Sequence, residues 1–517
     1  MISQHVFQDG VVPGGRSSGA ASAIKWCGLA LVLWGFAAVP AQGAEDPVTL
    51  AMKLLEQRHY GQAAATLRTA LPSIDQARQG AAHLTLGMIY QRTAELHREL
   101  HQASLAVNAD YLKRLDAARG GSRSRAAGLY YGELLLETGK HDLAAREIEQ
   151  FLATADIDEK QRAFGKISLG IAALRSGDRK KAEGQWSDVL GDEPDALAML
   201  AAAYSEAGMN DKNPLALAEK SVAQAKKRRG GPGMRLLASV VPVYVKAGRI
   251  DQALSLVAEY DLKSYSYKEV LGRSKVIYFY EYSLLQSLSN LYLKAAIASF
   301  ERAVQDPKVR DTASYYLGAA YSMAGDIDQS MKALTAFLAS PQMPQQFKDR
   351  AAARQATNQY QKGKQLDAVS MWDELSDRQP VDPDLLAEIL FACGRLQVDC
   401  PKVLKKAAAV AEDGDGRRYA TLNIALGRYH LGKKDLARAA SYMEAGRDKS
   451  NKNKIESNDP AMFVNLAGTY FRTKQFSEAL EIYFEMSKQF PEVRQIQEAM
   501  QGIYSMEHKS AGDVKIL

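Results

Sequence analysis

The sequence predicts an all-α protein built as a stack of similar helix–turn–helix units, because one motif recurs with a period of about 34 to 43 residues. The clearest unit carries, in order, Leu169, Gly170, Ala173, Gly177, Ala182, Trp186 and Pro194. The last unit repeats this order with Leu466, Ala467, Tyr470, Phe476, Ala479, Tyr483 and Pro491. A third unit has Ala356, Gly363, Ala368, Trp372 and Pro380. Self-similarity at a fixed period is typical of stacked supersecondary units.

The spacing within one unit predicts two packed helices. Apolar residues at the start of the unit recur three and four positions apart, which places them on one face of a first helix. Gly177 supplies the turn, and Pro194 ends the second helix because proline cannot continue a helix interior. Gly170 and Ala182 have no bulk, so we expect the two backbones to approach closely and the ring of Trp186 to fill the space beside them. Neither helix can bury its apolar stripe alone, so each unit needs a neighbour.

Further units follow the same order along the chain. Good matches are Tyr131, Gly132, Leu135, Gly139, Ala144 and Ile148; Val240, Val241, Tyr244, Gly248, Ala253 and Val257; and Leu317, Gly318, Tyr321, Gly325, Leu334 and Phe337. Weaker matches are Tyr60, Ala63, Leu67 and Ala70; Leu86, Gly87 and Tyr90; Leu200, Ala201, Tyr204 and Gly208; Ala296, Phe300 and Ala303; and Ile424, Ala425, Gly432 and Ala437. Residues 210–225 and 384–410 depart from the motif and are expected to form irregular helix pairs.

This motif resembles the tetratricopeptide repeat (TPR), a 34-residue helix–turn–helix unit. The resemblance implies an all-α, right-handed superhelical solenoid, here of about eleven or twelve TPR-like repeats. It also implies protein–protein interaction and assembly of multi-protein complexes. The alternative fold, a non-repetitive helical bundle, does not explain why the turn glycines stay in phase with the second-helix aromatics.

The N-terminus has the pattern of a secretory signal peptide over residues 1–43. Arg16 and Lys25 precede a 14-residue apolar run from Trp26 to Val39, and the small residues Ala41 and Gly43 follow it. The run is short for a membrane span, although an uncleaved membrane anchor remains the alternative. We therefore expect an exported protein that is periplasmic or peripheral to the outer membrane.

Residues 44–508 are predicted to form one TPR-like α-solenoid, since repeats that contact their neighbours escape the usual limit on domain size. Hinges are expected near residues 119–124, 229–233 and 447–458, and residues 509–517 form an unpatterned tail. The formal net charge of +6 over 517 residues is mild. It gives no strong signature of nucleic-acid binding.

Two cysteines, Cys393 and Cys400, follow the predicted signal peptide and are candidates for a disulfide. Cys393 is expected to end one helix and Cys400, which precedes Pro401, to open the next. In an oxidising compartment the pair can join across the turn. Two separate buried thiols are the alternative. The spacing is too wide for a CxxC redox or zinc motif.

Motifs for catalysis or cofactor binding give weak signals. His97 and His101 have zinc-ligand spacing, but no acid stands where an HExxH motif needs it, so we interpret residues 97–101 as a charged, solvated helix face. The basic run at residues 226–229 is interpreted as a helix end, where cations offset the macrodipole. The acidic run at residues 412–416 is too short for a calcium loop. No P-loop, dinucleotide fingerprint or nucleophile elbow is present, so we expect no enzyme, no metal and no cofactor.

Six of the 24 tyrosines lie within 28 residues, and they are candidate partner-binding residues. They are Tyr265, Tyr267, Tyr278, Tyr280, Tyr282 and Tyr292. Tyrosines spaced by two cannot all face one core from a helix, so we expect some to reach a surface and contact a peptide or sugar. Use of tyrosine as an ordinary core aromatic is the equally weighted alternative.

Two functions remain. The first is a non-enzymatic scaffold that binds protein partners in the bacterial cell envelope through the concave face of the solenoid and assists assembly of a multi-protein complex. The alternative is a periplasmic component of exopolysaccharide synthesis or secretion, for which polysaccharide would be a second partner. Neither involves nucleic acid, and both reach the membrane only through partners. A carbohydrate-active enzyme lacks a recognisable carboxylate pair.

Overall fold

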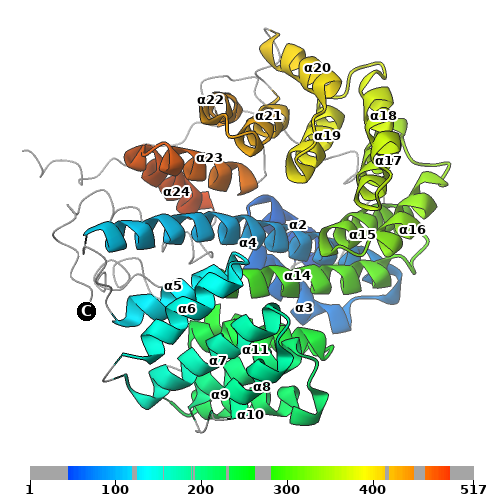
Figure 1. Ribbon diagram of the computed structural model, residues 1–517. Helices are drawn as coiled ribbons and strands as arrows, with labels where there is room; N and C mark the ends of the chain where they lie inside the picture. Colours follow the sequence, from blue (N-terminus) through cyan, green and yellow to red (C-terminus); the bar gives the residue numbers. More distant parts are fainter. Residues whose placement is uncertain are drawn as a thin grey trace, which may run out of the picture. The chain divides into compact units, whose positions relative to one another are not determined.

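The computed structural model describes residues 45–118, 125–154, 157–187, 189, 193–228, 232–261, 281–413, 419–447 and 460–489. Within these residues the regular structure is helical and contains no β-strand, so the predicted all-α solenoid is confirmed (Figure 1). The helices belong to one compact unit that begins at Glu45. The predicted signal peptide and tail lie outside the described residues, as do the hinges at 119–124 and most of those at 229–233 and 447–458.

Ten pairs of consecutive helices are joined by short turns in the described part of the chain. The pairs are α2 (Pro47–Glu56) and α3 (Tyr60–Ala70); α5 (Arg125–Glu137) and α6 (His141–Leu152); α7 (Glu159–Arg175) and α8 (Arg179–Ser187); α9 (Pro194–Glu206) and α10 (Pro214–Lys226); α11 (Met234–Lys246) and α12 (Ile250–Asp261); α15 (Arg310–Ala324) and α16 (Ile327–Leu338); α17 (Gln345–Gln361) and α18 (Gln365–Ser376); α19 (Pro383–Leu396) and α20 (Pro401–Glu412); α21 (Ala420–Gly432) and α22 (Leu436–Arg447); and α23 (Pro460–Arg472) and α24 (Phe476–Gln489). Residues 210–225 and 384–410 were expected to form irregular helix pairs. The first segment begins with a short 3-10 helix (Asn210–Lys212) and continues into α10, and the second lies in α19 and α20 with one turn between them.

The close approach expected within one unit is present in α7 and α8. A Cβ atom on Gly170 would collide with the indole ring of Trp186, which is 1% exposed. The ring completes its polar contacts inside the unit, because its Nε1–H donates to the carbonyl of Ile167 at 3.1 Å. Gly177 takes the turn with φ +90°, a conformation that glycine adopts without strain. The positions predicted for Gly170, Gly177 and Trp186 are thus correct. The prediction that Pro194 ends the second helix was wrong, because α8 ends at Ser187 and Pro194 is the first residue of α9.

Two longer helices, α4 (Gln76–Ala118) and α14 (Glu281–Ala303), form a repeat whose two halves are far apart in sequence. A Cβ atom on Gly87 of α4 would collide with the ring of Phe300 in α14, which repeats the relation between Gly170 and Trp186. Farther along, the Oγ of Ser289 donates to the carbonyl of Ala94 at 2.9 Å. From Gly87 to Ala94 the residue numbers rise along α4, while those of their contacts fall from Phe300 to Ser289 along α14. The two helices therefore run antiparallel.

The weak motifs around Gly87 and Phe300 are therefore the first and second helices of one split repeat, and interpreting them as two separate units was wrong. The described helices between them, α5 to α12, form four pairs that we call the inserted repeats. Helices α15 to α24 form five pairs that we call the C-terminal repeats. The inserted repeats connect to the split repeat through α11, since the Oγ of Ser287 in α14 donates to the carbonyl of Ala238 at 3.0 Å.

Helix α4 also contacts the end of the repeat array. Glu99 accepts a hydrogen bond from Nδ2 of Asn465 in α23 at 3.2 Å, and a guanidinium nitrogen of Arg428 in α21 lies 2.9 Å from the same carboxylate. The expectation that each repeat contacts only its sequence neighbours is therefore wrong for α4. This long helix meets both its split partner and the C-terminal repeats.

None of the described helices is long and apolar enough to cross a lipid bilayer.

Candidate functional site

In α5 and α21, a charged side chain directly follows the glycine that touches the second helix of the pair. In α5, Gly132 contacts α6, where a Cβ atom on it would lie 2.5 Å from Ile148, and Glu133 comes next in sequence. One residue further along a helix rotates the side chain by about 100°. Glu133 is thereby turned away from α6. We call the surface formed by such side chains the first-helix face.

In the inserted repeats this face contains a buried ion pair between α5 and α11. Both carboxylate oxygens of Glu133 accept hydrogen bonds from Arg235 of α11, each at 3.0 Å. Ser168 of α7 donates a third hydrogen bond to the carboxylate at 3.1 Å. The two charged side chains are only 13% and 10% exposed. Burial raises the pKa of Glu133, and the positive charge of Arg235 opposes that shift.

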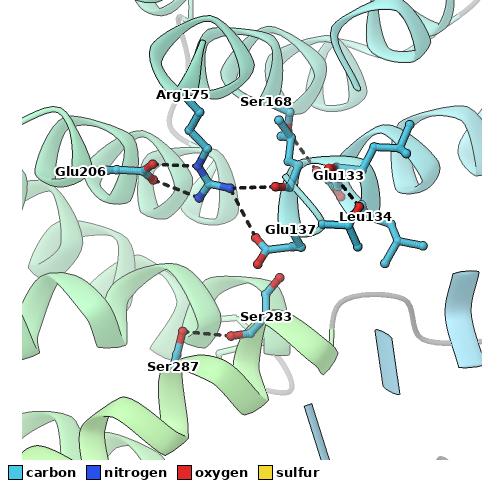
Figure 2. A network of polar contacts seen from close by, with 11 residues as sticks. Glu133, Leu134, Glu137, Ser168, Arg175, Glu206, Ser283 and Ser287 are labelled. Carbon is cyan, nitrogen blue, oxygen red and sulfur yellow. Dashed lines mark hydrogen bonds and ion pairs between the residues drawn. The ribbon is translucent and has the colours of Figure 1, made fainter. Parts of the chain in front are cut away.

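A second pairing on the same face centres on Arg175 at the end of α7 (Figure 2). Its guanidinium donates to both carboxylate oxygens of Glu206 in α9, at 2.8 and 3.2 Å. It also donates to the carbonyl of Leu136 at 3.3 Å and lies 4.0 Å from the carboxylate of Glu137. The first helices of the inserted repeats, α5, α7, α9 and α11, thus carry charged groups that pair with one another among the described residues.

The segment of α4 at residues 97–101 is buried, so its interpretation as a solvated face was wrong. Glu99 is 3% exposed, His97 7% and His101 8%. The ring of His97 stacks on Tyr292 with centroids 5.4 Å apart, and its Nδ1 lies 2.7 Å from the carbonyl of Thr93. Burial lowers the pKa of His97 to about 4. The neutral ring is a packing element of the α4–α14 interface.

Five arginines from α4 and the C-terminal repeats form a cluster, and three of them are paired. Arg92 lies 2.8 Å from Glu95, within α4. Arg354 of α17 and Glu388 of α19 are 2.7 Å apart. Arg428 of α21 pairs with Glu99, as described above. Aromatic rings support the cluster, with Arg354 5.2 Å from the centroid of Tyr315 and Arg428 5.2 Å from that of Phe391.

The other two members of this arginine cluster, Arg98 of α4 and Arg395 of α19, have no hydrogen-bond or ion-pair partner within the part of the chain that the structure describes. Arg395 is exposed and lies in the last turn of α19, whereas Arg98 is half-buried. Desolvation lowers the pKa of Arg395, and Arg98, Arg354 and Arg428 lower it further while Glu388 opposes them. Arg395 therefore lies within electrostatic reach of guanidiniums from three other helices.

The structure joins Cys393 and Cys400 by a disulfide, with an S–S distance of 2.01 Å. The bond spans the turn between α19 and α20, and Arg395 lies inside the loop that it closes. The cross-link therefore ties down the end of the helix from which Arg395 projects.

The six candidate tyrosines are only partly described. Tyr265, Tyr267, Tyr278 and Tyr280 lie outside the described residues, and so does the side chain of Tyr282. Tyr292 is half-buried between α14 and α4. Its ring packs against Tyr90, with ring centroids 6.0 Å apart, and against His97. Partner binding by this segment stays a prediction.

The basic run at residues 226–229 makes structural pairs where it is described. Lys226 lies 2.7 Å from Glu259, and Arg228 donates to both carboxylate oxygens of Glu193 at 3.0 and 2.9 Å. The Arg228 hydrogen bonds lower the pKa of Glu193 to about 2. Residues 414–416 of the acidic run lie outside the described residues. No group of histidine, cysteine and acidic residues within the described ranges could hold a metal ion.

Comparison with known proteins adds little beyond the helices themselves. No family model and no curated protein matches the chain. Solved structures that are similar to it include the APC/C hetero-tetramer Cut9–Hcn1, at 13% identity over 92% of this chain and 98% of that one, with a TM-score of 0.25. Another is yeast Tom70, at 12% identity over 89% of this chain and 94% of that one, with a TM-score of 0.31. Likenesses this weak carry no argument about function.

No motif in the sequence indicates the arginine cluster. Arg98 lies within the His97–His101 segment and Arg395 lies between the two cysteines, and neither position belongs to a binding motif. One signal was available, since Arg428 directly follows Gly427, just as Glu133 follows Gly132. In these two helices the charged residue at that offset lies on the first-helix face. The approach of α4 to this face had no local signal.

Proposed function

We propose that the protein is an exported, non-enzymatic helical-repeat scaffold that binds protein partners in the bacterial cell envelope. The observation that carries this proposal is the pair of unpartnered guanidiniums, Arg98 and Arg395, among the described residues of α4 and the C-terminal repeats. Arginine is enriched where proteins bind one another, because it combines charge, planar hydrogen bonding and an apolar stem. The first-helix face of the C-terminal repeats is the proposed binding surface.

Two features support export to the envelope. The apolar run from Trp26 to Val39, with basic residues before it and small residues after it, has the order of a signal peptide. The Cys393–Cys400 disulfide is a second support, because such bonds persist in oxidising compartments and are rare in the bacterial cytosol. The proposal places the mature chain in the periplasm.

The binding surface can be tested in living cells with a photo-crosslinking amino acid. Benzoylphenylalanine in place of Phe391 puts the probe on α19, beside Arg428 of the arginine cluster. The matched control replaces Leu366 of α18, which is 86% exposed on a second helix. We expect discrete protein adducts from the probe at position 391. The same adducts should be absent when the probe is at position 366.

Equal adducts from both positions, or none from position 391, would contradict the proposed surface. Adducts at position 391 that contain carbohydrate in place of protein would favour the exopolysaccharide alternative.

The compartment is tested on the same cells. We expect the chain in the periplasmic fraction, with its N-terminus near residue 44 and with Cys393 and Cys400 in one non-reduced peptide by mass spectrometry. Retention of Trp26 in the mature chain would argue for an anchored protein. Two fully alkylated cysteines in freshly isolated protein would remove the disulfide as support for export.

A further inference from the structure

The arginine cluster carries more positive charge than its own carboxylates neutralise. Glu95, Glu99 and Glu388 pair with three of the five guanidiniums. Arg98 and Arg395 interact with the charges of Glu95 and Glu388 but form no hydrogen bond or ion pair among the described residues. Bringing like charges together opposes folding. Natural sequences depart from such local rules mainly at functional sites. An external anion would supply the missing charge.

The two unpartnered guanidiniums come from different parts of the chain. Arg98 belongs to α4, the first half of the split repeat, and Arg395 to the last turn of α19 in the C-terminal repeats. The Arg428–Glu99 and Asn465–Glu99 contacts hold α4 against α21 and α23. The disulfide at Cys393 ties down the turn that carries Arg395. Both guanidiniums are therefore presented by elements fixed in place before a ligand arrives.

We propose that Arg98 and Arg395 bind carboxylates of an acidic segment in a protein partner, at a site shared between α4 and the C-terminal repeats. This proposal rests on the proposed function, because it specifies the chemistry of the partner. The planar guanidinium of arginine matches a carboxylate through two parallel hydrogen bonds. Because the two cations stand on different helices, they suit two carboxylates spaced along one segment.

The carboxylates already present decide which polyanion fits. Glu95 and Glu388 stay beside the unpartnered arginines, where they would repel a chain that is charged at every unit. A polyuronate or a nucleic acid has that uniform charge. A peptide with carboxylates separated by neutral residues can place its charges at the two guanidiniums and neutral atoms elsewhere. The observations therefore favour an acidic protein segment.

Binding can be measured on the full mature chain with a peptide of defined spacing. The probe is a fluorescein-labelled peptide of repeated Glu-Gly-Ser triplets, and its neutral counterpart has glutamine in place of glutamate. Fluorescence anisotropy is recorded at low salt and at physiological salt. We expect the acidic peptide to bind and the neutral one not to bind, with affinity falling as salt rises.

Variants then locate the site. Arg98→Gln and Arg395→Gln should each weaken binding about ten-fold or more, because a hydrogen bond to a charged group is lost. The double variant should bind the acidic peptide no better than the neutral one. The matched control is Arg179→Gln, which removes the same charge from an exposed ion pair with Glu183 in the inserted repeats. We expect the control to bind within about two-fold of the unmodified chain.

Undiminished binding by the double variant would overturn the proposal, and so would tighter binding of an oligogalacturonate than of the acidic peptide. Circular dichroism and thermal melts check the fold. If either glutamine variant fails to fold, the lysine variant at that position keeps the charge and should bind more weakly, because it loses the paired hydrogen bonds.

The crosslinking experiment separates failure of this proposal from failure of the proposed function. Protein adducts at position 391 that persist in the Arg98→Gln, Arg395→Gln double variant would leave the scaffold function standing and reject the acidic-segment site. Absence of adducts in the unmodified chain would reject the scaffold function itself. We expect adducts in the unmodified chain and their loss in the double variant.

Discussion

Glu133 in the inserted repeats and Arg428 in the C-terminal repeats hold the same place in their first helices. Each directly follows a glycine that touches the second helix, where an added Cβ atom would lie 2.5 Å from Ile148 or from Met443. The two side chains have opposite charges and different surroundings. Glu133 meets Arg235 within its own set of repeats, whereas Arg428 meets Glu99 of α4, 329 residues away in sequence.

The difference shows that one backbone unit serves two purposes. In the inserted repeats the charged groups of the first-helix face are matched with one another, so the face holds neighbouring repeats together. In the C-terminal repeats the same face meets α4, and the five arginines gathered there exceed the three carboxylates. The first arrangement contributes stability, and the second leaves Arg98 and Arg395 for a ligand.

The largest expected effect comes from breaking the buried pair of the inserted repeats. Glu133→Ala leaves the guanidinium of Arg235 buried without its carboxylate, which costs about 3–5 kcal/mol in the free energy of unfolding. Urea unfolding followed by circular dichroism measures it. Replacing both Glu133 and Arg235 by methionine removes both charges, so we expect that double variant to recover most of the loss. A double variant as unstable as Glu133→Ala would show that packing, and not the lone charge, causes the defect.

Acid should weaken the split repeat through His97. The ring is neutral in the folded chain down to a pKa of about 4, while in the unfolded chain it takes up a proton below its ordinary pKa of 6.5. Between these values the unfolded state binds more protons, so the free energy of unfolding falls as the pH falls. A tenfold difference in proton affinity between the two states corresponds to about 1.4 kcal/mol, so the loss of stability reaches about 3 kcal/mol at pH 4.

The variant His97→Phe isolates this contribution, because it keeps an aromatic ring beside Tyr292 and removes the titrating group. Urea unfolding of both chains at several pH values between 7 and 4 is the measurement. We expect the stability of the unmodified chain relative to the variant to decrease as the pH is lowered. A difference that stays constant over this range would show that His97 does not titrate in that window.

A third change tests whether α4 and α14 truly form a repeat like the others. Gly87→Leu should destabilise the chain by about 1–3 kcal/mol, because the new side chain would overlap Phe300 in a packed interface. Gly170→Leu should act in the same way against Trp186. The matched control is Gly184→Leu in α8, where nothing lies within 4 Å of an added Cβ atom. Thermal melts that show Gly87→Leu to be as stable as the control would contradict the split repeat.

The sequence was sufficient for the structure within a unit. The Gly170–Trp186 approach and the turn at Gly177 follow from size and backbone freedom, which are properties of residues close together in the chain. The pairing of Gly87 with Phe300 could not be predicted in this way. Each motif looks like a weak complete unit, and nothing local indicates that Gly87 and Phe300, which are 213 positions apart, belong together.

The candidate site depended on contacts that local patterns do not encode. Residues 97–101 look polar along the helix, and only the approach of distant helices buries Glu99 and His97. The excess of positive charge likewise arises from combining α4 with α17, α19 and α21. The spacing of Cys393 and Cys400 across a single turn left a disulfide and two separate thiols as alternatives, and the structure has the disulfide.

The smallest expected effect on stability is at Arg395, and it sharpens the comparison most directly. Arg395→Gln removes a guanidinium that has no partner in the described chain and that has Arg98, Arg354 and Arg428 as electrostatic neighbours. We expect the variant to melt at the same temperature as the unmodified chain or slightly above it, because one repulsive charge is gone. The matched comparison is Arg235→Gln, which should lower the melting temperature by disrupting the pair with Glu133.

Salt gives a second measurement of the same effect. Added salt screens repulsion between exposed charges, so it should stabilise the unmodified chain more than Arg395→Gln. Thermal melts at low and high ionic strength compare the two. If Arg395→Gln lowered the melting temperature as Arg235→Gln is expected to do, Arg395 would be a structural residue with an intramolecular partner. The first-helix face of the C-terminal repeats would then hold repeats together, as that of the inserted repeats does, and would have no unpaired charge for a ligand.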